Sequence, residues 1–90
     1  MPEVSFTSNL KRFFPTLETT EVQNLTINEI LDEVNNKYPG IKDYIVDEHG
    51  QLRKHVNIFI DNELIKDKEF LSDKVQPGNS VYFMQALSGG

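Results

Sequence analysis

The stretch VNIFID at residues 56–61 decides the fold. Every second residue in it is aliphatic: Val56, Ile58 and Ile60. Successive side chains of a strand point to opposite faces, so this alternation predicts a strand with one continuously apolar face. An apolar face of a sheet has to be covered by another element. We therefore expect residues 56–61 to form a strand whose aliphatic face contacts a helix.

The helix that covers this face is predicted between residues 26 and 38. Thr26 and Glu29 have the spacing of a capping box, in which each side chain accepts a hydrogen bond from an amide at the helix start. Pro39 and Gly40 are signals that end a helix. Between these limits apolar residues recur at spacings of three and four and give one apolar stripe: Ile27, Ile30, Leu31, Val34 and Tyr38.

Three further strands are predicted at residues 4–7, 19–22 and 80–87. The first alternates apolar and polar residues, and the second is rich in β-branched residues and suits an antiparallel partner of the first. The order of strand, strand, helix, strand, irregular crossing and strand favours the α+β class, with a helix packed on one face of a sheet. A length of 90 residues fits a single domain at residues 1–90.

The composition excludes several kinds of site. The chain has no Cys, which excludes disulfides, thiolate zinc sites and a thiol nucleophile. His49 and His55 lack a third ligand at a suitable spacing, so we expect no metal site. The sequence also lacks a Gly-rich phosphate loop and the common serine-nucleophile motifs. We therefore expect a protein that is not itself an enzyme.

Charge and hydropathy exclude two classes of partner. A formal net charge of −5 opposes binding to nucleic acid. No apolar run approaches the roughly 20 residues of a membrane span, and the N-terminus lacks the regions of a signal peptide, so we expect a cytoplasmic protein. The one basic and aromatic run, Lys11-Arg12-Phe13-Phe14, is either a small anion-binding patch or a loop whose aromatic rings tuck under the domain. We favour the second interpretation because two cations release few counterions.

A family resemblance lies in three segments of the sequence: residues 54–63, residues 75–83 and the final Gly89-Gly90. In this order they resemble the third strand, the turn with its following strand, and the shared ending of the MoaD/ThiS-type ubiquitin-like sulfur carrier proteins, in particular of their CysO-like subgroup. Asn79 departs from the family's usual Asp, and Leu87-Ser88 departs from the commoner Val-Ala. The resemblance implies a β-grasp fold, with a mixed sheet of four to five strands and one main helix on one face.

The resemblance also implies a function for the last residues. An E1-like adenylyltransferase/sulfurtransferase would use ATP to convert the Gly90 carboxylate into an acyl-adenylate and then into a thiocarboxylate. A sulfur-accepting synthase would then take the sulfur for molybdopterin, thiamine or cysteine, and the chain would act as a co-substrate with no bound cofactor. Gly89 and Gly90 have no side chains and would fit a narrow channel. We expect residues 87–90 to form a flexible tail on a protein that is monomeric when free.

A partner surface is expected on the face of the sheet that points away from the helix. In a β-grasp fold the strands at residues 56–61 and 80–87 are neighbours, which would bring Phe59, Tyr82 and Met84 together. An exposed apolar cluster of this kind marks a partner site, and Met adapts to more than one partner. We include Leu87 in this surface. The alternative is that the loop around Phe13 covers the three side chains.

Two other functions stay open at this point. A ubiquitin-like modifier would use the same activated tail but would be joined to lysines of target proteins. A non-covalent β-grasp interaction module would leave the tail inert.

Overall fold

Residues 56–60 form the strand that the alternation predicts, one residue shorter than the expected range of 56–61. In the computed structural model, which describes residues 1–86, β3 (Val56–Ile60) buries Val56 and Ile58 in the core. The strand ends before Asp61, whose φ of 56° is incompatible with extended backbone. The aliphatic face of β3 therefore points inward, as expected.

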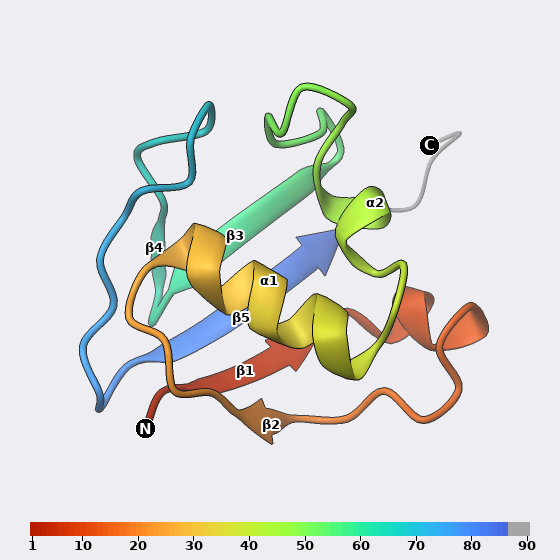
Figure 1. The fold of residues 1–90 in the computed structure, drawn as a ribbon, viewed down its shortest axis with the longest axis horizontal. Coiled ribbons are helices and arrows are strands. Elements are labelled where there is room, and N and C mark those ends of the chain that lie inside the picture. The colour runs from red at the N-terminus through yellow and green to blue at the C-terminus, as the bar shows by residue number, and fades with distance from the viewer. Residues whose placement is uncertain (87–90) are drawn as a thin grey trace.

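Within residues 1–86, one mixed sheet of five strands forms in the order β2-β1-β5-β3-β4 (Figure 1). The central strand β5 (Ser80–Gln85) runs parallel to β1 (Glu3–Phe6) and antiparallel to β3. The two edges are short strands, β2 (Thr20–Glu21) against β1 and β4 (Glu63–Leu64) against β3. This is the β-grasp arrangement that the sequence predicts, and β4 is the strand that the sequence analysis missed.

The longest helix of the described part of the chain, α1 (Ile27–Lys37), lies across one face of this sheet (Figure 1). The stripe on the helix meets the inward side chains of the sheet, and each such side chain contributes about 1.5–3 kcal/mol when it is fully buried. The core residues of these two layers are at most 2% exposed: Ile27, Ile30, Leu31 and Val34 from α1, and Val4, Val56, Ile58, Val81 and Phe83 from the sheet.

The helix begins at the predicted residue, but the predicted capping box does not form. Thr26 is the N-cap, yet its hydroxyl donates to the carboxylate of Glu29 at 2.7 Å and caps no backbone amide. The first amides of α1 have other acceptors, because those of Ile27 and Asn28 donate to the carbonyls of Asp73 and Leu71. Tertiary contacts with residues 71–73 therefore replace the local cap.

Two short helices complete the fold at the end of the sheet where β1 and β5 both finish. The 3-10 helix η1 (Ser8–Arg12) follows β1 directly, and α2 (Lys42–Ile45) follows the end of α1 after a short turn (Figure 1). Tyr44 of α2 and Phe14, which lies two residues after η1, both pack against the core. Their rings meet edge to face at a centroid separation of 5.4 Å. These contacts hold η1 and α2 beside the end of β5.

Candidate partner-binding site

The face of the sheet opposite α1 carries the three side chains predicted to form a partner surface. Phe59 of β3 lies directly across from Tyr82 of β5, and their ring centroids are 6.5 Å apart. Met84 comes two residues after Tyr82 and therefore points to the same face. All three side chains are half-buried. The structure thus brings Phe59, Tyr82 and Met84 together, and we call these residues the open-face patch.

The open-face patch extends toward one edge of the sheet and stops toward the other. Leu64 of β4 pairs with Phe59 and is 48% exposed, so it continues the apolar surface. The sequence analysis missed Leu64, because a strand of two residues shows no alternation. On the other side Tyr82 pairs with Ser5 of β1, where the apolar surface ends.

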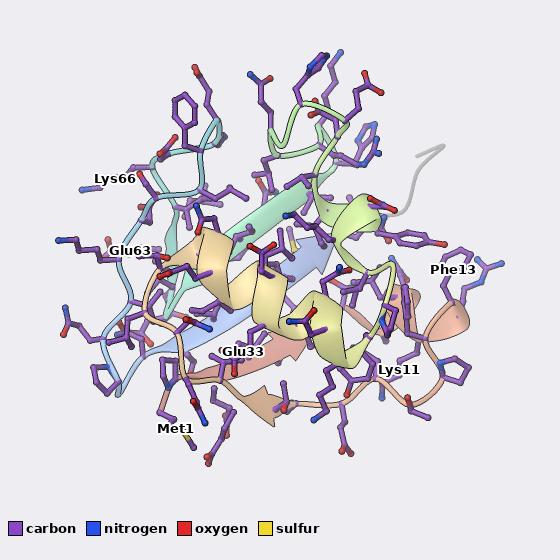
Figure 2. All side chains as sticks on the ribbon, in the orientation of Figure 1. Met1, Lys11, Phe13, Glu33, Glu63 and Lys66 are labelled. Atoms are coloured by element: carbon purple, nitrogen blue, oxygen red, sulfur yellow. The ribbon has the colours of Figure 1, made fainter. Side chains whose placement is uncertain are left out.

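The loop around Phe13 does not supply the cover that was considered for this patch. Phe13 stacks on Tyr44 of α2, with ring centroids 4.9 Å apart and an interplanar angle of 31°. Phe14 packs against the core, whereas Phe13 remains 52% exposed (Figure 2). The expectation that both aromatic rings tuck under the domain is therefore correct for Phe14 and wrong for Phe13.

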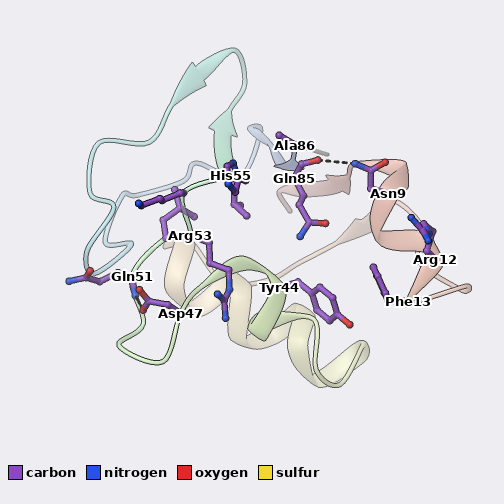
Figure 3. Close-up of a pocket in the computed structure, with 13 residues that line it drawn as sticks. Asn9, Arg12, Phe13, Tyr44, Asp47, Gln51, Arg53, His55, Gln85 and Ala86 are labelled. Atoms are coloured by element: carbon purple, nitrogen blue, oxygen red, sulfur yellow. Dashed lines mark hydrogen bonds between the residues drawn. The ribbon is translucent and has the colours of Figure 1, made fainter. Parts of the chain in front are cut away.

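The end of β5 is anchored on both sides, at the point where the predicted tail begins. On the β1 side, the Thr7 hydroxyl accepts the amide of Gln85 at 2.9 Å. The Asn9 amide Nδ2 donates to the carbonyl of Gln85 at 3.0 Å (Figure 3). On the β3 side, the amide of Ala86 donates to the carbonyl of His55 at 2.8 Å. We call these contacts the tail anchor.

The topology explains why the tail anchor can form. The parallel strands β1 and β5 finish at the same end of the sheet, and the antiparallel strand β3 begins at that end. Thr7 and Asn9 follow β1, and His55 precedes β3, so all three lie beside the end of β5. The predicted site residues Leu87, Gly89 and Gly90 lie outside the described residues.

A pocket of about 680 Å³ adjoins the tail anchor, and we call it the tail-base pocket (Figure 3). Its walls come from η1 and the residue after it, from α2, from residues 47–56 and from the end of β5. Three of the chain's nine Lys and Arg residues line it, but only one of its fourteen Asp and Glu residues. These charged residues are Arg12, Arg53, Lys54 and Asp47.

Asp47, the one Asp or Glu that lines this pocket within residues 1–86, is engaged by its own loop. Asp47 Oδ1 accepts the amides of His49 at 2.8 Å and Gln51 at 3.0 Å. The hydrogen bond from Gln51 is the main reason that the pKa of Asp47 lies below its ordinary value, with smaller contributions from the His49 amide and from the charges of His49 and Arg53. Asp47 therefore stays ionised and fixes the turn at residues 47–51.

The part of the chain that the structure describes holds neither a candidate metal site nor a helix that could cross a membrane. Within residues 1–86 no three His, Asp or Glu side chains are grouped in a way that could hold a metal ion. None of the helices in this range has the length and apolar character needed to cross a membrane.

Comparisons with known proteins agree with this fold. The family model described as the ThiS family matches residues 4–90. The sulfur carrier protein CysO of Mycobacterium tuberculosis is 27% identical over 67 residues, which are 72% of this chain and 72% of CysO. A chain in the crystal structure of the Amycolatopsis orientalis BexX/CysO complex has a TM-score of 0.85 and 26% identity, with 100% of both chains covered.

A more distant structure shows how widely the fold extends. The small archaeal modifier protein SAMP1 of Haloferax volcanii has a TM-score of 0.76 and 19% identity, with 99% of this chain and 98% of that chain covered. At that identity the likeness shows the fold alone. The family match, by contrast, spans nearly the whole chain and confirms the resemblance found in the sequence. The chain therefore belongs to the ThiS family.

Proposed function

We propose that this chain, a sulfur carrier by its family, holds its sulfur as a thiocarboxylate at Gly90 and delivers it to a second protein. The observation that carries the proposal is the family match over residues 4–90, which includes Gly89 and Gly90. The tail anchor supports it, because a segment that leaves a fixed strand end can be presented to a partner in a defined direction. The chain acts as a co-substrate and not as an enzyme.

The chemistry takes place on the carboxyl group of Gly90 in the active site of a partner. A carboxylate oxygen attacks the α-phosphorus of ATP, and pyrophosphate leaves. Sulfur at the oxidation level of sulfide then adds to the carbonyl carbon, the bond from that carbon to the adenylate oxygen breaks, and AMP leaves. ATP is bound by the partner, an E1-like adenylyltransferase/sulfurtransferase. Because activation consumes ATP, we place the carrier in the cytoplasm.

Glycine at both final positions suits this chemistry. A residue without Cβ adopts backbone angles that other residues avoid, and it allows close approach of another backbone. A side chain at Gly90 would crowd the carbonyl carbon that the sulfur must reach. The sulfur is carried by the main chain, which is consistent with the absence of Cys from the sequence.

The open-face patch is the proposed docking surface for the activating enzyme and for the sulfur-accepting synthase. Phe59, Tyr82 and Met84 combine two rings and a flexible thioether on one face. Aromatic and Met side chains are enriched at protein interfaces. Leu64 extends the apolar contact. Leu87, which lies outside the described residues, stays a predicted member of this surface. Docking by this face leaves α1 and the core untouched.

The proposal is tested with the purified adenylating enzyme of the same organism and ATP–pyrophosphate exchange. The wild-type chain is expected to stimulate exchange, and deletion of Gly90 is expected to abolish it. The deletion should leave the melting temperature unchanged, because a residue beyond the last strand contributes little to stability. Exchange that proceeds equally well without Gly90 would refute the proposal. High-mass conjugates on denaturing gels would instead indicate a protein modifier.

The docking surface is tested separately with Phe59→Asp and Met84→Asp. Each is expected to raise the Kd for the activating enzyme about tenfold or more, as for a central interface residue. Leu25→Asp is the matched control, because Leu25 is also an exposed apolar residue, at 42%, and lies outside the open-face patch. Circular dichroism should show the native fold in all three variants. Unchanged affinity of both patch variants would place the docking surface elsewhere.

A further inference from the structure

The tail-base pocket has a position that the proposed function leaves unexplained. Gln85 and Ala86, the last two described residues, form part of its wall. A protein that receives the residues after Ala86 in its active site therefore comes close to this pocket. The pocket is thus continuous with the proposed contact between the tail and its partner, while the open-face patch forms a second contact on the sheet.

The pocket is also the place where positive charge is concentrated on an acidic molecule. Arg12, Arg53 and Lys54 line this pocket together with one Asp side chain, although the whole chain has a net charge of −5. The other thirteen Asp and Glu residues do not line this pocket, so a negatively charged partner segment is attracted to it more than to the rest of the described surface. A local charge of this kind selects and orients a partner.

Two of the cations are held in place by neutral groups and not by carboxylates. The guanidinium of Arg12 lies 5.9 Å from the ring centroid of Phe13, which in turn stacks on Tyr44. The Nε of Arg53 donates to the carbonyl of Asp43 at 2.9 Å. Across residues 1–86, neither guanidinium forms an ion pair. Each therefore keeps donors available for a carboxylate, and the fork geometry of Arg suits bidentate binding.

We propose that the tail-base pocket binds an acidic segment of the activating enzyme, a loop that carries Asp or Glu side chains. This inference rests on the proposed function, because it assumes that the enzyme receives the tail. A carboxylate-bearing segment is favoured over a nucleotide because, among residues 1–86, no glycine lines the pocket to form a backbone phosphate loop. Carboxylates paired with Arg12 and Arg53 fix how far the tail reaches into the enzyme.

The first experiment measures the Kd of the activating enzyme for Arg12→Glu, Arg53→Glu and a matched control, Lys66→Glu. Lys66 lines a different pocket, at the opposite end of β3, and lies far from Phe13 in the molecule (Figure 2). At low salt each Arg variant is expected to bind about tenfold more weakly, because like charges would now face each other. The control should bind within about twofold of wild type. At about 1 M salt, where the Debye length is about 3 Å, the difference in Kd between wild type and the Arg variants should largely disappear.

Equal affinities of wild type and both Arg variants would overturn the inference, and so would an equal loss in Lys66→Glu. The second experiment does not depend on the enzyme and titrates the ¹⁵N-labelled chain with hexaglutamate peptide and, separately, with ATP. The peptide should shift the amide signals of Phe13, Tyr44 and Arg53, and ATP should not. Shifts with ATP alone, or none with the peptide, would overturn the inference. If the enzyme fails to adenylate wild type, the proposed function falls and the peptide titration still decides the pocket.

Discussion

Replacing Thr7 by Val isolates the contribution of the tail anchor to stability. The hydroxyl of Thr7 accepts the amide of Gln85 at 2.9 Å and donates to the carbonyl of Phe83 at 3.2 Å. Valine has a similar shape but makes neither hydrogen bond. Each is worth about 0.5–1.5 kcal/mol net, so we expect the free energy of unfolding to fall by about 1–3 kcal/mol. In a domain of this size the melting temperature should drop by at least about 4 °C.

Urea denaturation gives the free energy of unfolding, and amide hydrogen exchange shows where the loss occurs. The amides of Gln85 and Ala86 should exchange faster in Thr7→Val, because the end of β5 then opens locally. Thr19→Val is the matched control: Thr19 is exposed, and its side chain forms no hydrogen bond within residues 1–86. The free energy of unfolding of the control should stay within about 0.5 kcal/mol of the wild-type value. A Thr7→Val protein with wild-type stability and wild-type exchange at Gln85 would refute the role of the tail anchor.

Two further predictions concern the core and the pH dependence of stability. Phe83→Ala should lower the free energy of unfolding, measured by urea denaturation, by about 3–5 kcal/mol. The reason is that Phe83 is fully buried and its ring stacks on that of Phe6, with centroids 5.6 Å apart. A loss below about 1 kcal/mol would mean that this part of the core is loosely packed. Partial burial raises the pKa of Glu33, but hydrogen bonds from Asn24 and Gln23 outweigh it and hold this pKa below its ordinary value of 4.5. The ionised Glu33 side chain therefore stabilises the fold above about pH 4.5, and this stabilisation is lost as the pH falls through the lower pKa of the folded state. The stability difference between wild type and Glu33→Gln should therefore shrink on acidification below about pH 4.5, and a difference that is the same at pH 3 and pH 7 would contradict this assignment.

The elements that the sequence predicts well are those that bury one face in the core and expose the other. The alternation in residues 56–61 and the apolar stripe of residues 27–38 are local patterns, and each is preserved because the buried side chains have to point one way. The start of α1 shows the limit of such reasoning. Thr26 and Glu29 have the spacing of a capping box, but carbonyls of residues 71–73 accept the first amides instead.

The parts that the sequence could not predict depend on contacts between distant segments. The strand β4 has two residues, so no period can appear in it, and Leu64 was missing from the predicted partner surface for that reason. The tail-base pocket joins Arg12, Tyr44 and Arg53 from three separate segments. Predicting this pocket requires the knowledge that the parallel strands β1 and β5 finish at the same end of the sheet, beside the start of β3.

The account depends most on the claim that the carboxyl group of Gly90 carries the sulfur. Mass spectrometry of the intact chain, purified after co-expression with its activating enzyme and a sulfur donor, tests this claim directly, and fragmentation locates the change. We predict a mass gain that corresponds to one oxygen replaced by one sulfur, confined to the fragment that ends in Gly90. An unchanged mass under conditions that support adenylation, or a sulfur located on any other residue, would contradict the account.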